Sequence, residues 1–165
     1  VSLFALQFAK LAGARVVATT SSPEKAERLR ALGADEVIDY RENPQWGTRV
    51  RELTNGQGVD LVVEIGGAGT LAQSLAAVRF GGAIALVGIL AGNAAEIPLT
   101  SIFMQNVRVL GILVGSRDAF EAMNRAVALH RLRPVVDSSY PWTEARAALE
   151  ALAAGRHVGK ITLGF

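Results

Sequence analysis

The chain has 165 residues, of which 50% are hydrophobic and 19% are charged, so it is long enough for one domain with a buried core and too apolar for a disordered protein. The net charge of +2 comes from arginines scattered along the sequence, without the basic stripe and interleaved aromatic residues that would indicate nucleic acid as a partner. No apolar run approaches the roughly 20 residues that span a bilayer, no export signal is visible, and the absence of cysteine favours a cytoplasmic protein without membrane contact.

Strand and helix patterns alternate along the chain. Short apolar, β-branched runs predict five strands, at Arg15–Thr20, Glu36–Tyr40, Val59–Ile65, Ala83–Val87 and Val107–Val114. Apolar residues at helical spacing, with caps and breakers, predict helices from Val1 to Leu11, from Ser22 to Leu32, from Asn43 to Leu53, through Leu71, Leu75 and Val78, from Ile102 to Gln105, through Phe120, Met123 and Val127, and from an N-cap at Thr143 to Gly155.

The alternation predicts the fold class. Strands that are apolar on both faces and separated by helices of about three turns are typical of a parallel sheet covered by helices on both sides. We therefore expect one α/β domain over residues 1–165, with a doubly wound, mostly parallel sheet. The pattern loosens from Pro134 to Pro141, which indicates a return of the chain toward another domain.

The end of the first predicted strand carries phosphate-binding chemistry. Ligands of open parallel sheets lie beyond the carboxyl ends of the strands, where Thr20, Ser21 and Ser22 stand with Lys25 one helical turn later. Hydroxyls and a cation at a helix N-terminus attract phosphate. A simpler interpretation stays open, in which Ser22 only caps the helix and Lys25 is solvated.

The same strand end bears on the choice of nucleotide. Dinucleotide folds carry Asp or Glu here when the ribose is unphosphorylated, because a carboxylate binds the 2′-hydroxyl and repels a 2′-phosphate. Thr20 occupies this position, with Lys25 and Tyr40 close by in the expected fold. The sequence therefore favours NADP over NAD.

Glycines come directly after two other predicted strands. Gly66 and Gly67 follow the strand that ends at Ile65, and Gly88 follows Val87, which would let a cofactor approach the backbone closely. Strand-to-helix turns also need glycine for left-handed dihedral angles, so a purely structural interpretation stays open for each of them.

No other catalytic pattern stands out. His130 and His157 are far apart and have no carboxylate at metal-ligand spacing, and Ser138–Ser139 has no nucleophile-elbow context. We therefore expect no metal ligand and no catalytic residue in this chain.

Three segments together resemble the medium-chain dehydrogenase/reductase family, and specifically zinc-type alcohol dehydrogenases and quinone oxidoreductases. They are Ala31–Tyr40 (ALGADEVIDY), Val59–Gly67 (VDLVVEIGG) and Gly159–Thr162 (GKIT). The resemblance covers essentially the whole chain. It implies a Rossmann-type cofactor domain, with the segment from about residue 134 belonging to the catalytic domain of a full-length relative.

The resemblance also implies roles for individual residues. Thr20, Ser21, Ser22 and Lys25 would lie near the adenosine ribose and its phosphate, and Tyr40 beside the adenine. Ile65 and Gly66 would line the cofactor groove, while Gly88, Ile89, Leu113 and Val114 would approach the nicotinamide. Members of the family commonly pair into dimers through the strand Val107–Val114, and pairing would protect an apolar edge.

Two departures from the family pattern affect these expectations. The family's first strand and glycine-rich G-x-G-x-x-G loop would precede Val1, so we expect a gap in the sheet where the central strand would stand. Relatives usually carry Asp at the position of Glu64. The family's N-terminal domain, which holds any zinc ligands and most substrate contacts, also has no counterpart here.

The leading hypothesis is the cofactor-binding part of an NAD(P)H-dependent oxidoreductase that transfers hydride to or from a carbonyl or an activated alkene, inactive as this fragment alone. One alternative is a non-catalytic nucleotide-binding or assembly module on the same scaffold. Another is a methyltransferase with an adenosyl cofactor, because Gly66–Gly69 suits several nucleosides, although Thr20 supplies no acid for the ribose hydroxyls.

Overall fold

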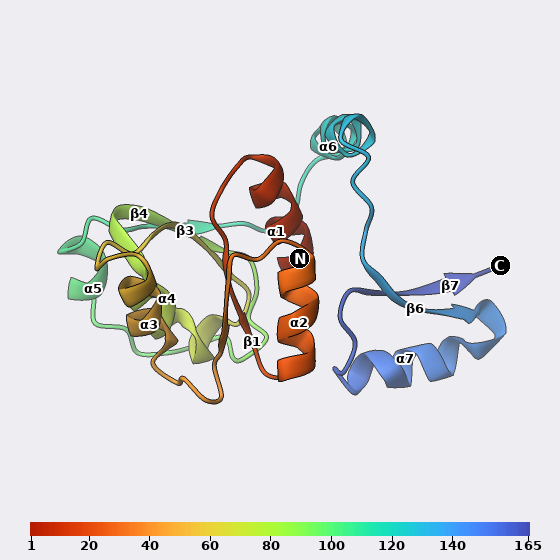
Figure 1. Ribbon diagram of the computed structural model, residues 1–165, viewed down its shortest axis with the longest axis horizontal. Coiled ribbons are helices and arrows are strands. Elements are labelled where there is room, and N and C mark those ends of the chain that lie inside the picture. The colour runs from red at the N-terminus through yellow and green to blue at the C-terminus, as the bar shows by residue number, and fades with distance from the viewer. The chain divides into compact units, whose positions relative to one another are not determined.

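The computed structural model describes residues 1–165, which form two compact units, Val1–Val114 and Gly115–Phe165 (Figure 1). The first unit contains α1 (Ser2–Leu11), β1 (Val17–Thr20), α2 (Pro23–Ala31), β2 (Glu36–Asp39), α3 (Trp46–Leu53), β3 (Val59–Glu64), a 3₁₀ turn (Gly67–Gly69), α4 (Leu71–Ala77), β4 (Val78–Leu86), α5 (Thr100–Phe103) and β5 (Arg108–Gly111). None of the helices combines the length and the apolar composition that crossing a membrane requires.

The strands of the first unit are parallel but divide between two sheets. β1 pairs with β2, and β4 lies between β3 and β5. The expected α/β class with parallel strands is confirmed. The expected gap is also present, because β1 and β3 share no ladder of hydrogen bonds and each has only one neighbouring strand.

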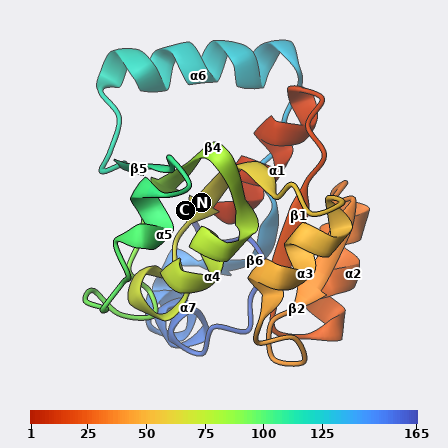
Figure 2. The same cartoon turned by 90° about the vertical axis from the view of Figure 1, so that its left-hand side faces the viewer.

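Helices α3 and α4 pack against each other and join the two sheets (Figure 2). Ile38 of β2, Val50 of α3 and Ala77 of α4 form one buried cluster, against which Val17 of β1 and Val62 of β3 also pack. The apolar residues of both sheets therefore meet in a core that does not depend on strand pairing between them.

Several expected boundaries in the first unit are wrong. The helix expected to open at Asn43 begins at Trp46, and the strand expected from Ala83 already begins at Val78. Val78 begins β4 instead of ending a helix, because its backbone is extended, it pairs with Val59, and its carbonyl accepts a hydrogen bond from Arg51 Nη2 at 2.7 Å. The long strand expected over Val107–Val114 is only Arg108–Gly111. The neighbouring strand β4 ends at Leu86, whose carbonyl accepts the last ladder hydrogen bond from Ile112 N, so residues after Ile112 have no strand to pair with.

The second unit contains α6 (Arg117–Leu129), β6 (Val136–Pro141), a 3₁₀ turn (Trp142–Glu144), α7 (Ala145–Ala153) and β7 (Lys160–Gly164). β6 and β7 pair in parallel, and α7 packs on both of them. Helix α6 has no buried residue.

Two features of the second unit differ from the sequence-based expectations. The segment expected to be loose contains the strand β6. Its serines weaken the apolar pattern that predicts a strand, but in the structure the Ser139 hydroxyl lies 2.8 Å from the Thr162 hydroxyl on β7. Thr143 does not cap the last helix, because it lies inside the 3₁₀ turn and the N-cap position belongs to Glu144.

Asp35 makes the stability of the first unit dependent on pH. Its carboxylate accepts hydrogen bonds from Lys10 Nζ at 2.8 Å and from Val16 N at 2.7 Å, and the Lys10 bond, followed by the Val16 bond, lowers the pKa of Asp35. A pKa that is lower in the folded state stabilises the fold above the unfolded value of about 4, and this contribution is lost as the pH falls through the folded value.

We therefore expect Asp35→Asn to flatten the dependence of unfolding free energy on pH below about pH 4. Urea unfolding of the wild type, Asp35→Asn and the surface control Glu42→Gln between about pH 7 and pH 3 measures this dependence. The prediction would be contradicted if the unfolding free energy of Asp35→Asn changed with pH as steeply as that of the wild type.

Candidate functional site

The residues expected to bind a nucleotide gather at the carboxyl ends of the strands in two groups. The first group follows β1 and β2, and the second follows β3 and β4. The two groups belong to separate sheets.

The first group lies around the end of β1. Tyr40 N donates to the carbonyl of Thr20 at 3.0 Å, so the residues that follow β1 and β2 are neighbours. Ser22 is the N-cap of α2, and its hydroxyl accepts a hydrogen bond from Lys25 N at 3.3 Å. The capping role that the sequence left open for Ser22 is therefore confirmed.

Two carboxylates lie at this corner. A hydrogen bond from Ser22 lowers the pKa of Glu24, in the first turn of α2. Asp39, which stands opposite Thr20 in the sheet, accepts a hydrogen bond from Arg41 N at 2.8 Å through Oδ1. Arg41 follows Tyr40 and adds a cation that the sequence analysis did not single out. Lys25, Arg41 and the N-terminus of α2 offer positive charge to an anionic group such as a phosphate, beside the carboxylates of Glu24 and Asp39.

The second group is a pair of interlocked loops, Ile65–Gly69 after β3 and Gly88–Gly92 after β4. Leu90 N donates to Ile65 O at 3.1 Å, Ala91 N donates to Gly66 O at 2.7 Å, and Ala68 N donates to Gly92 O at 2.9 Å. The backbone bonds of the two loops therefore satisfy each other and continue the pairing of β3 with β4.

A buried carboxylate holds the first of these loops. Glu64 is 3% exposed, and its Oε1 accepts hydrogen bonds from Gly66 N at 2.6 Å, Gly67 N at 3.1 Å and Thr70 Oγ1 at 2.6 Å. Its Oε2 accepts a hydrogen bond from the buried Ser74 hydroxyl on α4. The residue that departs from the family pattern therefore organises the turn between β3 and α4.

The glycines of these loops have a packing requirement of their own. A Cβ on Gly66 would lie 2.3 Å from Thr70 Oγ1, and a Cβ on Gly88 would lie 2.6 Å from Ile65 O. Gly67 has a φ of +75°, in the left-handed region that favours glycine. The expected left-handed dihedral angle is thus confirmed for Gly67 but wrong for Gly66, which has a φ of −82°, and for Gly88, where packing alone requires glycine. Their approach to a cofactor stays a prediction.

Leu113 and Val114 are not held in either group. They follow β5, are 90% and 83% exposed, and lie beyond the last ladder bond at Ile112. Ile89 is also exposed, but it belongs to the interlocked loop after β4.

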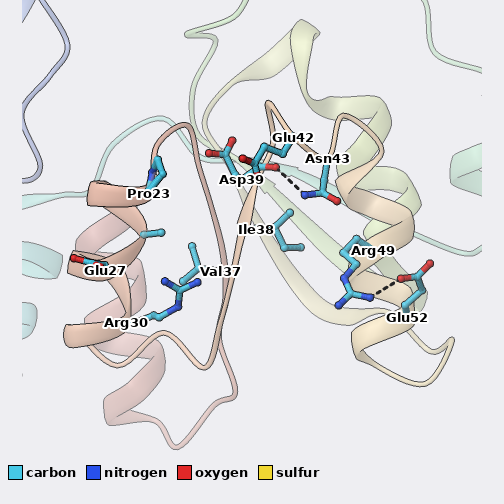
Figure 3. Close-up of a pocket in the computed structure, with 11 residues that line it drawn as sticks. Pro23, Glu27, Arg30, Val37, Ile38, Asp39, Glu42, Asn43, Arg49 and Glu52 are labelled. Atoms are coloured by element: carbon cyan, nitrogen blue, oxygen red, sulfur yellow. Dashed lines mark hydrogen bonds and ion pairs between the residues drawn. The ribbon is translucent and has the colours of Figure 1, made fainter.

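A groove of about 660 Å³ lies beside β2, between α2 and α3 (Figure 3). Its charged residues include Arg30 on α2 and the ion pair of Arg49 and Glu52 on α3, whose Nη1 and Oε2 atoms are 2.7 Å apart. None of the predicted site residues lines this groove.

No three His, Asp or Glu side chains lie close enough together to share a metal ion, and the sequence contains no cysteine.

The interlocked loops leave no room for a side chain at Gly88. Gly88→Ala should lower the free energy of unfolding by about 1–3 kcal/mol, because the new methyl group meets backbone atoms that cannot rotate away. Gly111→Ala, where a Cβ meets nothing within 4 Å, is the matched control and should stay within about 0.5 kcal/mol of wild type. Urea unfolding compares the two, and equal losses would contradict the prediction.

Comparisons with known proteins place the chain in a family. The family model described as zinc-binding dehydrogenase matches residues 1–128. A zinc-type alcohol dehydrogenase-like protein of Schizosaccharomyces pombe is 40% identical over 99% of this chain and 48% of its own length. These matches are to dehydrogenases, not to methyltransferases.

Solved structures agree with this assignment. The crystal structure of an NAD-dependent alcohol dehydrogenase superposes with a TM-score of 0.91 at 36% identity, covering 99% of this chain and 48% of that one. A mycobacterial protein complexed with NADPH superposes with a TM-score of 0.81 at 31% identity, covering 98% of this chain and 52% of that one. The chain thus spans about half the length of the relatives it matches. It belongs to the zinc-binding dehydrogenase family and has the Rossmann-type fold of its cofactor domain.

Proposed function

We propose that the chain is the cofactor-binding part of a cytoplasmic, NADPH-dependent oxidoreductase whose substrate is a carbonyl compound or an activated alkene. The observation that carries the choice of NADPH is the corner at the end of β1, where Thr20 replaces an acid and Lys25 lies in the first turn of α2. One solved relative is an NAD-dependent alcohol dehydrogenase, and another was solved in complex with NADPH. Both support a nicotinamide dinucleotide as the cofactor, without deciding between NAD and NADP.

In this proposal, different residues of the chain bind the two halves of the cofactor. Ser21 and Lys25 hold the 2′-phosphate at the N-terminus of α2, where the backbone dipole favours negative charge, while the Ser22 hydroxyl caps the helix and bonds Glu24. Tyr40, which is 44% exposed beside Thr20, offers its ring to the adenine.

The interlocked loops receive the other half of the cofactor. Ile65, Gly66, Gly88 and Ile89 offer backbone and apolar surface to the nicotinamide half, with Leu113 and Val114 beside it in the complete enzyme. When bound, the nicotinamide supplies or accepts hydride at C4, and the fold orients its reactive face and limits water. Zinc and most substrate contacts are assigned to a further domain, because this chain has no suitable ligands.

The decisive experiment is a calorimetric titration of NADPH and NADH into this chain and into a version extended by the preceding coding sequence. Saturable binding of NADPH, tighter than that of NADH, by the extended version supports the proposal. Failure of both versions to bind either nucleotide would contradict it and favour a non-catalytic assembly module.

Lys25 provides a sharper test of the phosphate corner. Lys25→Ala should weaken NADPH binding at least tenfold and leave NADH binding nearly unchanged, because one charge-assisted contact contributes about 1.5–3 kcal/mol. Arg30→Ala, on the same helix but in the groove beside β2, is the matched control. Equal losses for NADPH and NADH would remove Lys25 from the phosphate site.

We also propose that two copies pair through β5, whose outer edge has no partner strand and whose Val109 and Leu110 are 38% and 47% exposed. Leu110→Lys should then convert a dimer into a monomer in sedimentation velocity. Leu149→Lys, at an exposed apolar position on α7, should leave the dimer intact. A wild type that sediments as a monomer would exclude this pairing.

A further inference from the structure

We infer that Glu64 is a positioning residue for the nicotinamide half of the cofactor site. This inference rests on the proposed function, because it concerns the same site. Glu64 itself is 3% exposed and does not reach the surface that the cofactor would touch. Its effect is transmitted through the loop that it holds.

The surroundings of Glu64 are unusual for a buried charge. A carboxylate is costly to bury unless it is paired or fully hydrogen-bonded, and no cation contacts this one. Instead it accepts hydrogen bonds from two backbone N–H groups and two hydroxyls. An ionised acceptor strengthens each of these bonds relative to a neutral acceptor.

The four donors tie together three parts of the structure. Gly66 N and Gly67 N belong to the loop after β3, Thr70 lies at the start of α4, and Ser74 lies one turn further along that helix. The carboxylate therefore fixes the direction in which the chain leaves β3 and enters α4.

The second loop depends on the first. Val87 N and Gly88 N donate to the carbonyl of Glu64 at 2.8 Å and 3.2 Å, and Leu90 N and Ala91 N donate to the carbonyls of Ile65 and Gly66. Ile65, Gly66, Gly88 and Ile89 all lie on these two loops. Loss of the Glu64 anchor should therefore change the shape of the surface proposed to face the nicotinamide.

The carboxylate also occupies the donors of the turn. Successive backbone N–H groups in a glycine turn form a concave site that binds anions such as phosphate. At Gly66 and Gly67 both N–H groups are already bonded to Glu64. The turn is thereby closed to phosphate and presents carbonyl and apolar surface, which suits the uncharged end of a dinucleotide.

The adenosine half should be insensitive to Glu64. Thr20 ends β1, Ser22 caps α2 and Tyr40 follows β2, and the β1–β2 sheet shares no strand pairing with β3. A probe that fills only this half, adenosine 2′,5′-bisphosphate, thus serves as an internal control within the same protein.

The test uses the version of the protein that binds NADPH in the titration described above. Glu64→Gln should raise the Kd for NADPH at least tenfold and change the Kd for adenosine 2′,5′-bisphosphate less than twofold. Glu64→Asp keeps a carboxylate that can bond N–H groups two and three residues later, and should keep NADPH binding within about threefold of wild type.

Val50→Ala is the control for a general loss of stability, because Val50 is buried in the core cluster with Ile38 and Ala77 and belongs to neither loop. It should lower the melting temperature without changing the ratio of the two dissociation constants. A ratio in Glu64→Gln equal to that of Val50→Ala would overturn the inference and leave Glu64 a purely structural residue.

Ser74→Ala keeps the test decisive if Glu64→Gln does not fold. This substitution removes one donor to Glu64 Oε2 and should raise the Kd for NADPH, by a smaller factor than Glu64→Gln, without changing the Kd for adenosine 2′,5′-bisphosphate. A ratio of the two dissociation constants equal to that of the wild type would again overturn the inference. If wild type binds neither ligand, the proposed function fails. If wild type binds both and the variants keep its ratio, only the role of Glu64 fails.

Discussion

The packing of α3 on α4 is the constraint on which the first unit depends. The β1–β2 sheet and the β3–β4–β5 sheet share no strand pairing, so helices must hold them together. Gly47 allows the closest approach, because a Cβ there would lie 2.4 Å from the carbonyl of Gln73 on α4. Gly47 N also donates to Gln73 Oε1 at 2.9 Å.

Arg51 strengthens the same junction from its other end. Its guanidinium donates to the carbonyls of Ala76 and Val78 at 2.6 Å and 2.7 Å, and to Gln105 Oε1 at 2.9 Å. These bonds satisfy carbonyls at the point where α4 ends and β4 begins. A single side chain on α3 thereby connects α4, β4 and the segment that precedes β5, and it explains why the helix stops at Ala77.

The sequence was sufficient for the order of elements in the first unit and insufficient for several of their ends. Pro23 and the cap at Ser22 make the start of α2 readable because they act within one helical turn. The end of β5 depends on where β4 stops, and the strand β6 depends on pairing with β7, which are both non-local. That the residues after β1 and β2 are neighbours could be anticipated from strand-end rules alone.

The role of Glu64 could not be anticipated in the same way. Its donors range from Gly66, two residues later, to Ser74, ten residues later, and only the turn between β3 and α4 brings them to one carboxylate. A signal was present in the sequence, since an acid at the end of an apolar strand must find partners if it is buried. The sequence did not show whether those partners were its own backbone or a ligand.

The two halves of the site use opposite means of recognition. At the end of β1 the N-terminus of α2 and Lys25 offer positive charge, on which the proposed preference for a phosphorylated ribose rests. At the end of β3 the backbone donors that could bind a phosphate are bonded to a carboxylate of the protein itself. A dinucleotide has one strongly anionic end and one uncharged ring, so in the proposed site only one of its two ends matches each strand end. An internal carboxylate that occupies the donors of a turn removes a competing anion site without any contact with the ligand.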